Sequence, residues 1–189
     1  MDKREKIIQA SIDVFKEQGI EKTKISNIVK QAGIAQGTFY LYFPSKLAVM
    51  PAIAEKMIEQ WVEAIDERVK LNAPLLEQVN QLIEAAFQVS KEFRDLTVLT
   101  YAGLSTSDQL DQWENIYASL YQKVEEIIDQ NQSNGSIRQN TDSYRLAKLT
   151  VGTMEMTAEQ VFLYDEYQEQ EERDQKEALS KFLYQALKK

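Results

Sequence analysis

The sequence predicts an all-α protein, with a small N-terminal head of three helices at residues 1–46 and a larger helical body at residues 47–189. Three observations predict this fold class. Only six glycines and three prolines interrupt 189 residues, and these are the residues that disfavour helix interiors most. Glutamate, lysine, glutamine, alanine and leucine, which favour helices, are abundant. Apolar side chains recur at three- and four-residue spacing along most of the chain, which is typical of amphipathic helices.

The head begins with an amphipathic helix expected over residues 3–18, and Gly19 is expected to end it as a C-terminal glycine. Thr23 then offers a side-chain oxygen that can cap a second helix over residues 25–31. Apolar residues at helical spacing give this second helix a single face for packing.

A turn at residues 32–33, which contains a glycine, leads to a third helix over residues 36–42. Two short helices joined in this way form a helix-turn-helix. Such a pair has too little core of its own, so we expect the first helix to lie across it. The side chains expected to be buried there are Phe15, Ile28, Phe39 and Phe43.

The third helix has the residues that a DNA recognition helix needs. Gly37 would allow close approach to a phosphate backbone. Gln36 and Thr38 can exchange hydrogen bonds with base edges in the major groove. The hydroxyls of Tyr40 and Tyr42 suit phosphate oxygens, which position a protein without reading sequence. The alternative is that these two tyrosines only pack in an interface.

The residues that follow this helix add a candidate phosphate contact. Ser45 is expected to cap the next helix, and Lys46 lies in the first turn of that helix. A helix N-terminus with a lysine beside it attracts anions. Lys46 therefore joins the candidate DNA-binding residues.

Residues 23–46, TKISNIVKQAGIAQGTFYLYFPSK, resemble the signature of the TetR family of transcriptional regulators. Detailed similarity covers about the first quarter of the chain, and the remainder matches in length and helical character. The resemblance implies a DNA-binding domain at residues 1–46 and a ligand-binding and dimerisation domain at residues 47–189. The matched positions are Thr23, Ile28, Ala32, Gly33, Gly37, Thr38, Tyr40, Tyr42, Phe43, Ser45 and Lys46.

Four residues depart from the family pattern. Val29 replaces the usual alanine, and Leu47 replaces a frequent acidic residue. Ala35 replaces a serine, which should remove a helix cap worth about 1 kcal/mol together with a phosphate donor. Lys24 stands where a second threonine is common, and it is a further candidate phosphate contact.

The body is expected to open with a helix from residue 45 to about residue 69, with Pro51 in its second turn. An interior proline removes a backbone hydrogen bond and kinks a helix. In the TetR family this helix joins the head to the body, so a kink there would be a place where motion is passed between them. A bend without a role is the alternative.

Five further helical stretches are expected in the body. Asp108 and Asp142 are the expected caps of two of them. The polar segment 131–142, with Asn-Gly at its centre, is the clearest loop of the chain. The acidic stretch 165–177 is expected to be a solvated helix end and turn. The helical stretches cover residues 75–87, 96–104, 108–128, 142–162 and 179–187.

The composition excludes several kinds of catalytic and metal site. The chain has no cysteine and no histidine, which excludes disulfides, thiolate nucleophiles, zinc sites built on those residues and imidazole acid–base catalysis. A helical di-iron centre would also need histidine. We therefore expect no catalytic residues, no metal and no other cofactor. An enzyme built on carboxylates alone stays open as an alternative.

Charge is distributed unevenly along the chain. Residues 1–50 contain eight basic and five acidic side chains, a net charge of +3. Residues 51–189 contain 14 basic and 25 acidic side chains, a net charge of −11, and the two values sum to the −8 of the whole chain. The acidic total therefore does not argue against nucleic acid as a partner, because the head alone is basic.

The N-terminal segment and the apolar runs predict a cytoplasmic protein without membrane contact. Residues 1–19 carry charges where a secretory signal would be apolar. The longest apolar runs, such as residues 48–54, are far shorter than the ~20 residues that a membrane helix needs.

The resemblance implies two further properties of the body. The last two helices would form a four-helix interface with a second copy, so that two heads about 34–36 Å apart meet a palindromic operator. The body would also enclose a small-molecule pocket. Glu155 and Glu159 would favour a cationic ligand, but their spacing indicates the polar face of their helix. The candidate ligand residues, which at helical spacing are more often ordinary core, are Tyr101, Trp113, Tyr117, Tyr121 and Met154.

The sequence therefore predicts a homodimeric DNA-binding transcriptional regulator, a repressor that an unidentified small molecule releases from its operator. Two alternatives stay open. One is a regulator of the same fold that a protein partner controls, and the other is a helical interaction module that has lost DNA binding. The sequence does not disclose the operator, the regulated genes, the ligand, or repression as opposed to activation.

Overall fold

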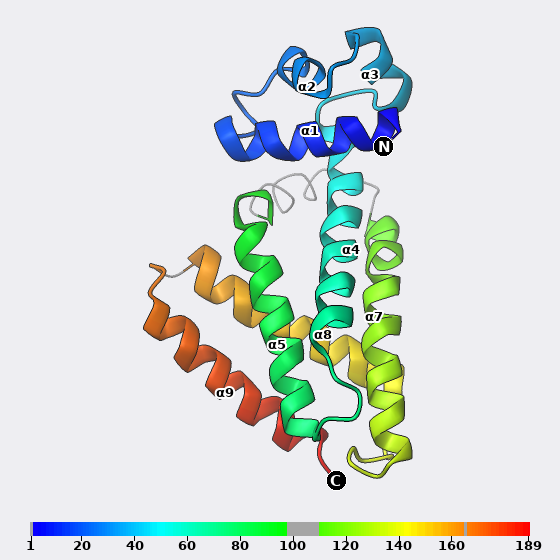
Figure 1. Cartoon of the computed structure of the whole chain (residues 1–189), viewed down its shortest axis with the longest axis vertical. Coiled ribbons are helices and arrows are strands. Elements are labelled where there is room, and N and C mark those ends of the chain that lie inside the picture. Colours follow the sequence, from blue (N-terminus) through cyan, green and yellow to red (C-terminus); the bar gives the residue numbers. More distant parts are fainter. Residues whose placement is uncertain (1, 98–109, 165) are drawn as a thin grey trace. The chain divides into compact units, whose positions relative to one another are not determined.

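The computed structural model describes residues 2–97, 110–164 and 166–189, without the side chains of residues 110–113. The named elements within these ranges are all helices, so the predicted all-α class is confirmed (Figure 1). The elements are α1 Lys3–Gln18, α2 Ile25–Ala32, α3 Gln36–Tyr42, the 3₁₀ turn η1 Leu47–Val49, α4 Met50–Arg68, α5 Leu75–Glu92, α7 Leu110–Ser133, α8 Ser143–Glu159, the π-helical turn η2 Gln160–Tyr164 and α9 Glu169–Leu187.

The chain divides into two compact units. One unit comprises Met1–Lys56 and Asp95–Ile116, and we call it the head unit. The other comprises Met57–Arg94 and Tyr117–Lys189, and we call it the body unit. Helix α4 therefore contributes its first residues to the head unit and its remaining residues to the body unit.

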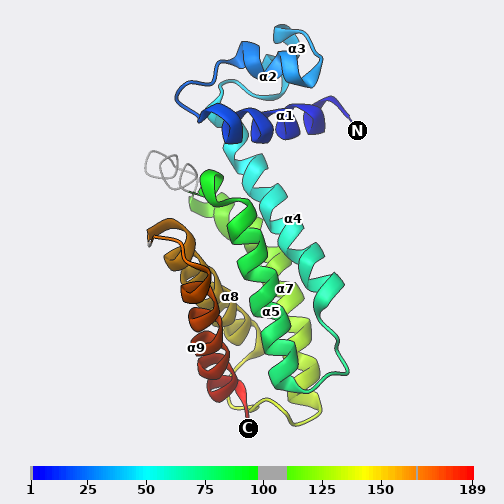
Figure 2. The ribbon, with the colours of Figure 1, turned by 60° about the vertical axis from the view of Figure 1, so that its left-hand side comes forward.

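In the head unit, α1 packs against α2 and lies beneath both α2 and α3, as predicted (Figures 1 and 2). Asp2 caps α1 by accepting a hydrogen bond from the amide of Glu5 at 2.8 Å. Gly19, with a φ of 75°, ends the helix. The four side chains predicted for this core are all buried: Phe15, Ile28, Phe39 and Phe43.

The start of α2 differs from the prediction. The hydroxyl of Thr23 donates to the backbone carbonyl of Gly19 at 2.7 Å instead of capping α2. Asn27 takes the capping role, because its side-chain oxygen accepts a hydrogen bond from the backbone N–H of Lys24 at 2.9 Å. The cap predicted at Thr23 is therefore wrong. The hydroxyl of Thr23 lies next to the end of α1, where the helix leaves backbone carbonyls unpaired, and it donates its proton to one of them.

The entry to α4 also differs from the prediction. The 3₁₀ turn Leu47–Val49 comes first, and the α-helix begins at Met50. Ser45 caps the 3₁₀ turn, since its hydroxyl oxygen accepts a hydrogen bond from the amide of Ala48 at 3.2 Å. Pro51 is then the second residue of α4, where a missing N–H removes no hydrogen bond of that helix. Whether α4 bends at this proline stays a prediction.

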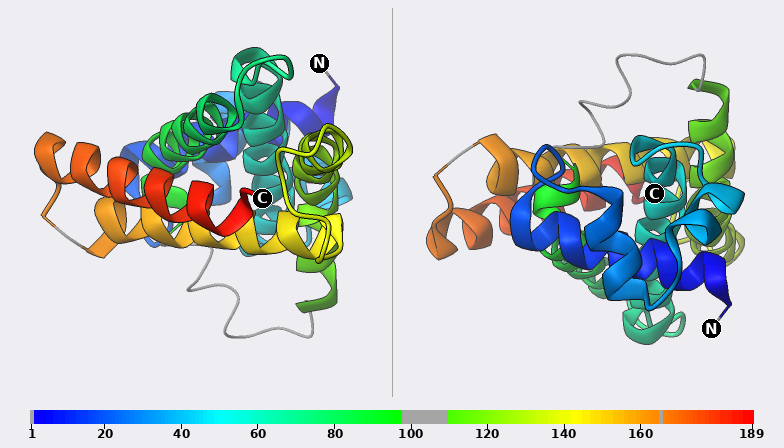
Figure 3. Two further views of the ribbon diagram at one scale, coloured as in Figure 1. Left: turned by 90° about the horizontal axis from the view of Figure 1, so that it is seen from below. Right: turned by 90° about the horizontal axis from the view of Figure 1, so that it is seen from above.

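In the body unit, α5 packs against α8 and α9, and α8 and α9 run side by side in opposite directions (Figure 3). Phe87 of α5 and Phe162 of η2 meet edge to face with their ring centroids 5.9 Å apart. Tyr167 stacks on Phe162 at 5.7 Å. Phe87 and Phe162 are buried and form part of the core of the body unit, whereas Tyr167 is 37% exposed.

A buried pair of amide side chains links α5 to the end of α7. Asn131 donates to the side-chain oxygen of Gln78 at 2.8 Å, and each residue is 1% exposed. Gln78 in turn donates to the carbonyl of Ala73 at 2.7 Å. Buried amides without partners are destabilising, so this series of bonds fixes the two helix ends together. The polar loop begins later than predicted, because α7 continues to Ser133.

The ends of α8 and α9 test two further predictions. Asp142 caps α8 as predicted, because its carboxylate accepts a hydrogen bond from a backbone N–H of the first turn at 3.1 Å. The acidic stretch is more helical than predicted, since α9 begins at Glu169. Glu172 in this stretch pairs with Lys91 of α5 at 3.3 Å and with Lys176 at 2.9 Å.

No helix in the described ranges is long and apolar enough to cross a membrane. The described side chains also contain no group of three or more acidic residues that could hold a metal ion. The predicted cap Asp108, and most of the helical stretch predicted over residues 96–104, lie outside the described residues.

Candidate nucleic-acid interface

The turn between α2 and α3 is built around Gly33. This residue has a φ of 66° and a ψ of 36°, the left-handed region that favours glycine. Its N–H donates to the carbonyl of Lys30 at 3.3 Å, and the N–H of Ile34 donates to the carbonyl of Val29 at 3.0 Å. These bonds close the end of α2. Helix α3 then begins without a side-chain cap, because Ala35 precedes it.

Helix α3 has one buried face and one exposed face. Phe39 at its centre is fully buried. Tyr40 rests against Phe39 with ring centroids 5.7 Å apart, yet the residue is 50% exposed, and Tyr42 is 44% exposed. The structure therefore brings the α3 candidates together on one short helix. The five candidate DNA contacts of α3, all exposed or partly exposed, are Gln36, Gly37, Thr38, Tyr40 and Tyr42.

Gly37 has open space around it. A methyl group added at its Cα would meet no atom within 4 Å. Glycine in a helix is less stable than alanine by about 1 kcal/mol, and contacts within the chain give no reason for that loss. Leu41, four residues further on and so on the same face, is 83% exposed. Sequence reasoning overlooked Leu41, although its spacing from Gly37 was a usable signal.

The two candidate lysines have different surroundings. Lys24, directly before α2, is exposed. Lys46 is half-buried, and its ammonium donates to the backbone carbonyls of Ile20 and Thr23 at 2.6 and 2.8 Å, with the carbonyl of Glu21 at 3.5 Å. Lys46 thus has partners inside the head unit that its position in the sequence did not indicate.

Two ion pairs join α1 to the first turns of α4 within the head unit. Arg4 pairs with Glu55 at 3.4 Å, and Lys56 pairs with Glu5 at 3.6 Å. The guanidinium of Arg4 also lies 5.9 Å from the ring centroid of Phe43. Exposed pairs contribute little stability one at a time, but together these contacts hold Phe43 and the first turns of α4 against α1.

The candidate ligand residues of the body are only partly described. Tyr101 lies outside the described residues, and the side chain of Trp113 is not described. Tyr117 and Tyr121 of α7 lie side by side, with ring centroids 5.7 Å apart. Met154 of α8 is fully buried. The two tyrosines therefore form one aromatic surface on α7.

Two acidic residues of α8 lie differently from the prediction. Glu159 is 3% exposed, and Glu155 accepts a hydrogen bond from the hydroxyl of Tyr117. Burial is the main reason that the pKa of the Glu155 carboxyl is raised to about 7; the bond from Tyr117 opposes the rise, and the charge of Glu159 adds to it. The polar face predicted for these two glutamates is therefore wrong.

Trp61 of α4 is a further residue that sequence reasoning did not single out. It is 4% exposed. Within the described part of the chain, its indole N–H is a buried side-chain donor without a hydrogen-bond partner. A buried donor in that state is destabilising by about 1–3 kcal/mol, so a hydrogen-bond acceptor placed beside it would stabilise the body unit.

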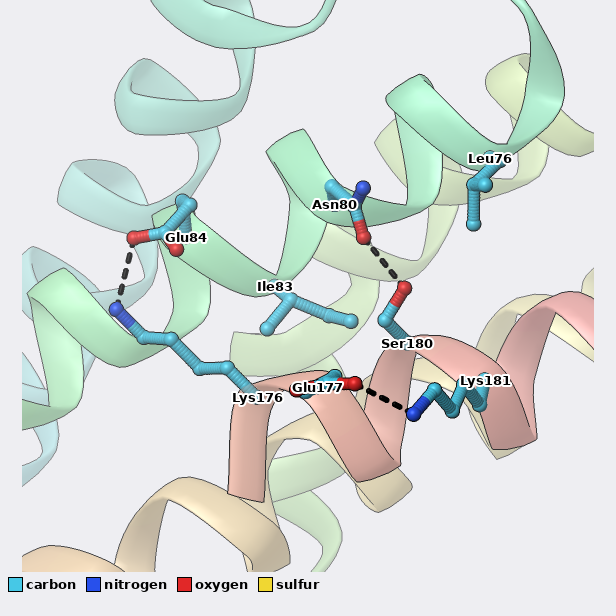
Figure 4. A pocket seen from close by; sticks show the side chains of 8 residues that line it. All are labelled: Leu76, Asn80, Ile83, Glu84, Lys176, Glu177, Ser180 and Lys181. Carbon is cyan, nitrogen blue, oxygen red and sulfur yellow. Dashed lines mark hydrogen bonds and ion pairs between the residues drawn. The ribbon is translucent and has the colours of Figure 1, made fainter. Parts of the chain in front are cut away.

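A surface groove of about 440 Å³ lies between α5 and α9 (Figure 4). Lys176 and Glu84 form an ion pair across it at 2.8 Å, and Ser180 donates a hydrogen bond to Asn80. None of the candidate ligand residues lines this groove, so it is distinct from the pocket expected inside the body. Its lining residues are Leu76, Asn80, Ile83, Glu84, Lys176, Glu177, Ser180 and Lys181.

Two family descriptions match this chain. Residues 7–53 match the bacterial regulatory proteins of the tetR family, and residues 79–187 match the tetracyclin repressor-like C-terminal domain. The two matches fall on the helix-turn-helix region and on most of the body, respectively.

Individual relatives agree with the family matches. The chain is 37% identical over 185 residues to the uncharacterized HTH-type transcriptional regulator YvdT of Bacillus subtilis (strain 168), covering 98% of this chain and 95% of that protein. It is 28% identical over 153 residues to the fatty acid metabolism regulator protein of the same strain, covering 80% and 79%. The crystal structure of FadR from Bacillus subtilis in complex with stearoyl-CoA has a TM-score of 0.74 at 24% identity, covering 95% and 97%. The chain therefore belongs to the TetR family of transcriptional regulators, a DNA-binding and non-enzymatic family.

Proposed function

We propose that the protein is a homodimeric repressor, which binds a palindromic operator in the cytoplasm and is released by a small-molecule effector. The observation that carries the proposal is the exposed face of α3. There Gly37 has no neighbour within 4 Å of an added methyl group, and Tyr40 and Tyr42 reach the surface. A helix that enters the major groove needs a small residue where the phosphate backbone comes close, with hydroxyls beside it to bind phosphate oxygens.

The remaining DNA contacts follow from position and exposure. Gln36 and Thr38, in the first turn of α3, are the proposed base contacts. Lys24 is exposed directly before α2 and is the proposed lysine contact to phosphate. Phosphate contacts of this kind make binding sensitive to salt, with the logarithm of the affinity falling by about 0.9 per contact for each tenfold rise in salt.

The proposed dimer forms through α8 and α9. Leu149 and Met156 of α8 are 65% and 58% exposed, and Phe182 of α9 is 62% exposed. Large apolar side chains that gather at a surface are typical of a protein–protein interface, and the proposal places these three in one. Gly152 lies between the two α8 side chains, and a methyl group added there would meet no atom within 4 Å, so a second helix can approach closely. A dimer would place two heads on successive major grooves about 34–36 Å apart.

The proposed effector is a long-chain fatty acyl-CoA. Two relatives support this class: the fatty acid metabolism regulator protein by sequence, and the FadR structure with stearoyl-CoA by fold. In the body unit, the buried N–H of Trp61 can donate to a carbonyl oxygen, and the rings of Tyr117 and Tyr121 offer an apolar surface. The proposed contacts in the body unit are Trp61, Tyr117, Tyr121 and Met154. Tyr101 and Trp113 stay ligand candidates on the sequence alone.

The first test is binding of the purified protein to the DNA upstream of its own gene, followed by fluorescence anisotropy at two salt concentrations. Scrambled DNA of equal length is the control. We expect tight, salt-sensitive binding to the first DNA alone. Equal and weak binding to both DNAs would contradict the proposal for this operator.

The second test adds acyl-CoA to the protein–operator complex. Stearoyl-CoA is expected to release the DNA, whereas free coenzyme A, which has the same charged portion without the acyl chain, is expected to leave the complex intact. If neither compound releases DNA or shifts the melting temperature of the free protein, the proposed effector is wrong. Control by a protein partner would then be the better reading of the body.

A further inference from the structure

Lys46 lies four residues beyond α3 and reaches back to the turn between α1 and α2. Its Nζ is 2.6 Å from the carbonyl oxygen of Ile20 and 2.8 Å from that of Thr23. The carbonyl oxygen of Glu21 lies at 3.5 Å. The two short contacts have the length of strong charge-assisted hydrogen bonds. We call this set of contacts the Lys46 bridge.

The Lys46 bridge closes a segment that contains the whole helix-turn-helix. The bonded residues are 26 and 23 positions apart in the chain, and both α2 and α3 lie between them. The beginning and the end of the two-helix segment are therefore held at one point beside the end of α1. A closed segment has fewer arrangements open to it than one attached at a single end, so the bridge restricts how α2 and α3 can turn on α1.

The turn that accepts these bonds is itself well ordered. Thr23 is 2% exposed, and it donates its hydroxyl to the carbonyl of Gly19 at 2.7 Å and its N–H to the carbonyl of Ile20 at 3.1 Å. The turn follows directly on the C-terminal end of α1, where backbone carbonyls carry partial negative charge and favour a cation. The ammonium of Lys46 therefore supplies the positive charge that this group of carbonyls favours.

We propose that Lys46 is a positioning residue, which holds α2 and α3 in place for DNA binding and does not itself contact phosphate. An ammonium has three N–H donors. Two of them are used in short bonds to carbonyls and the third faces the carbonyl of Glu21, so a phosphate contact would require breaking the bridge. The inference rests on the proposed function only in the experiments that measure DNA binding. It replaces the phosphate contact predicted for Lys46 from sequence.

The matched control is Lys24, which is exposed in the same head unit and has the same side chain. Lys46→Met and Lys24→Met keep the apolar stem and remove the ammonium. In Lys46→Met we expect backbone amides of residues 19–46 to exchange with solvent about tenfold faster, because a charge-assisted bond is lost. Operator affinity should fall by about tenfold, while the slope of log affinity against log salt stays that of the wild type.

Lys24→Met should give the opposite pattern. Its amide exchange should match the wild type, and its salt slope should be smaller by about 0.9, as expected for one lost phosphate contact. Lys46→Arg, which keeps the charge and offers donors to the same carbonyls, should recover most of the affinity and the exchange protection. A smaller salt slope in Lys46→Met with unchanged amide exchange would overturn the inference.

A measurement on the unaltered protein covers the case in which Lys46→Met does not fold. Acetylation of lysines by acetic anhydride, followed by mass spectrometry, should modify Lys24 faster than Lys46 in the free protein. Operator DNA should then protect Lys24 and leave the slow rate at Lys46 unchanged. Fast acetylation of Lys46 that DNA suppresses would overturn the inference. If the protein binds no DNA selectively, the proposed function fails, and acetylation of the free protein still decides on the Lys46 bridge.

Discussion

Helices α3 and α8 share one feature and differ in what surrounds it. Each carries a glycine, Gly37 or Gly152, where an added methyl group would meet no atom within 4 Å. Beside Gly37 the exposed side chains include two tyrosines, whereas beside Gly152 they are Leu149 and Met156. The open space at each helical glycine leaves room for another molecule, and the neighbouring side chains fit different partners. Phenols suit a polyanion, and aliphatic side chains suit another apolar helix.

The two helices also differ in what stabilises them. Helix α8 has 17 residues and the side-chain cap of Asp142, so part of its stability is local. Helix α3 has seven residues and no side-chain cap, and a helix of that length is not stable by itself in water. Its conformation depends on the burial of Phe39 and on the turn at Gly33. The proposed DNA-binding surface is thus held from beneath by its core.

The largest expected effect is that of Gly37→Leu. The added side chain should reduce operator affinity by at least about 100-fold, because it fills the space that close approach to the phosphate backbone needs. Stability should be unchanged or higher, since leucine favours helix more than glycine by about 0.8 kcal/mol. Anisotropy and thermal melting measure the two quantities. If this variant bound the operator with wild-type affinity, Gly37 would not lie in the interface. Gly37→Ala should show a smaller loss of operator affinity.

Met156→Glu tests the proposed dimer surface around Gly152 of α8. A charge in the middle of the proposed apolar interface should raise the dimer dissociation constant by about 100-fold, since a buried unpaired carboxylate is destabilising by several kcal/mol. Sedimentation velocity over a concentration series measures it. The control is Glu171→Gln. Glu171 is an exposed residue of α9 and is not one of the apolar side chains of the proposed interface. A Met156→Glu protein that stays dimeric at the same concentrations as the control would place the interface elsewhere.

The inner side of α8 gives a pH effect that α3 should lack. The pKa of Glu155 is raised from 4.5 to about 7, so the folded protein keeps this proton where the unfolded chain has lost it. Stability should therefore decline as the pH rises from about 4.5 to 7. Glu155→Gln should be more stable than wild type at pH 8, by up to about 3 kcal/mol, and nearly equal to it at pH 5.

Urea denaturation of both proteins at pH 5 and pH 8 measures that difference. The bond from Tyr117 can still form to a glutamine oxygen, so the substitution removes mainly the charge. Glu171→Gln serves again as a control, and its effect should be the same at both pH values. Stability curves for Glu155→Gln and wild type that stay parallel from pH 5 to pH 8 would contradict the prediction.

The smallest expected effect concerns the helix caps. Asp142→Ala should lower the free energy of unfolding by about 1 kcal/mol, because the first turn of α8 loses its acceptor. Ala35→Ser should raise it by a similar amount, of the order of 0.5–1 kcal/mol, because α3 gains one. Denaturant midpoints measure both changes. If both substitutions changed the free energy of unfolding equally and in the same direction, the starts of α3 and α8 would not differ in their side-chain caps.

The bounds of α1 and α3 are those expected from the sequence. Gly19 and Gly33 have backbone conformations with positive φ, which glycine adopts readily, so they mark the ends of α1 and α2 in the sequence itself. The buried face of the head was equally predictable from helical spacing, as the burial of Phe15 and Phe39 shows. The start of α4 was not predictable in this way, because hydrophobic periodicity does not separate a 3₁₀ turn from an α-helical one.

The side-chain roles that sequence reasoning missed depend on partners far along the chain. Lys46 binds carbonyls 23 and 26 residues away, and Glu155 is bonded to a tyrosine 38 residues away. Spacing along one helix cannot reveal either contact, because it describes a helix face without naming what packs on it. Thr23 is a different case, since two local rules compete for its hydroxyl and only the geometry of the turn decides between them.

The Lys46 bridge sets where a hybrid regulator can be joined. A join directly after α3 would combine the recognition helix of this protein with a foreign residue at the position of Lys46. A join directly after Lys46 would keep the bridge but would lose Glu55 and Lys56, the partners of α1. A join beyond Lys56 carries all of these contacts into the hybrid. We therefore expect the smallest DNA-binding segment that can be transferred to another protein to be longer than the helix-turn-helix. The last residues that contact α1 lie in α4, the helix that follows it.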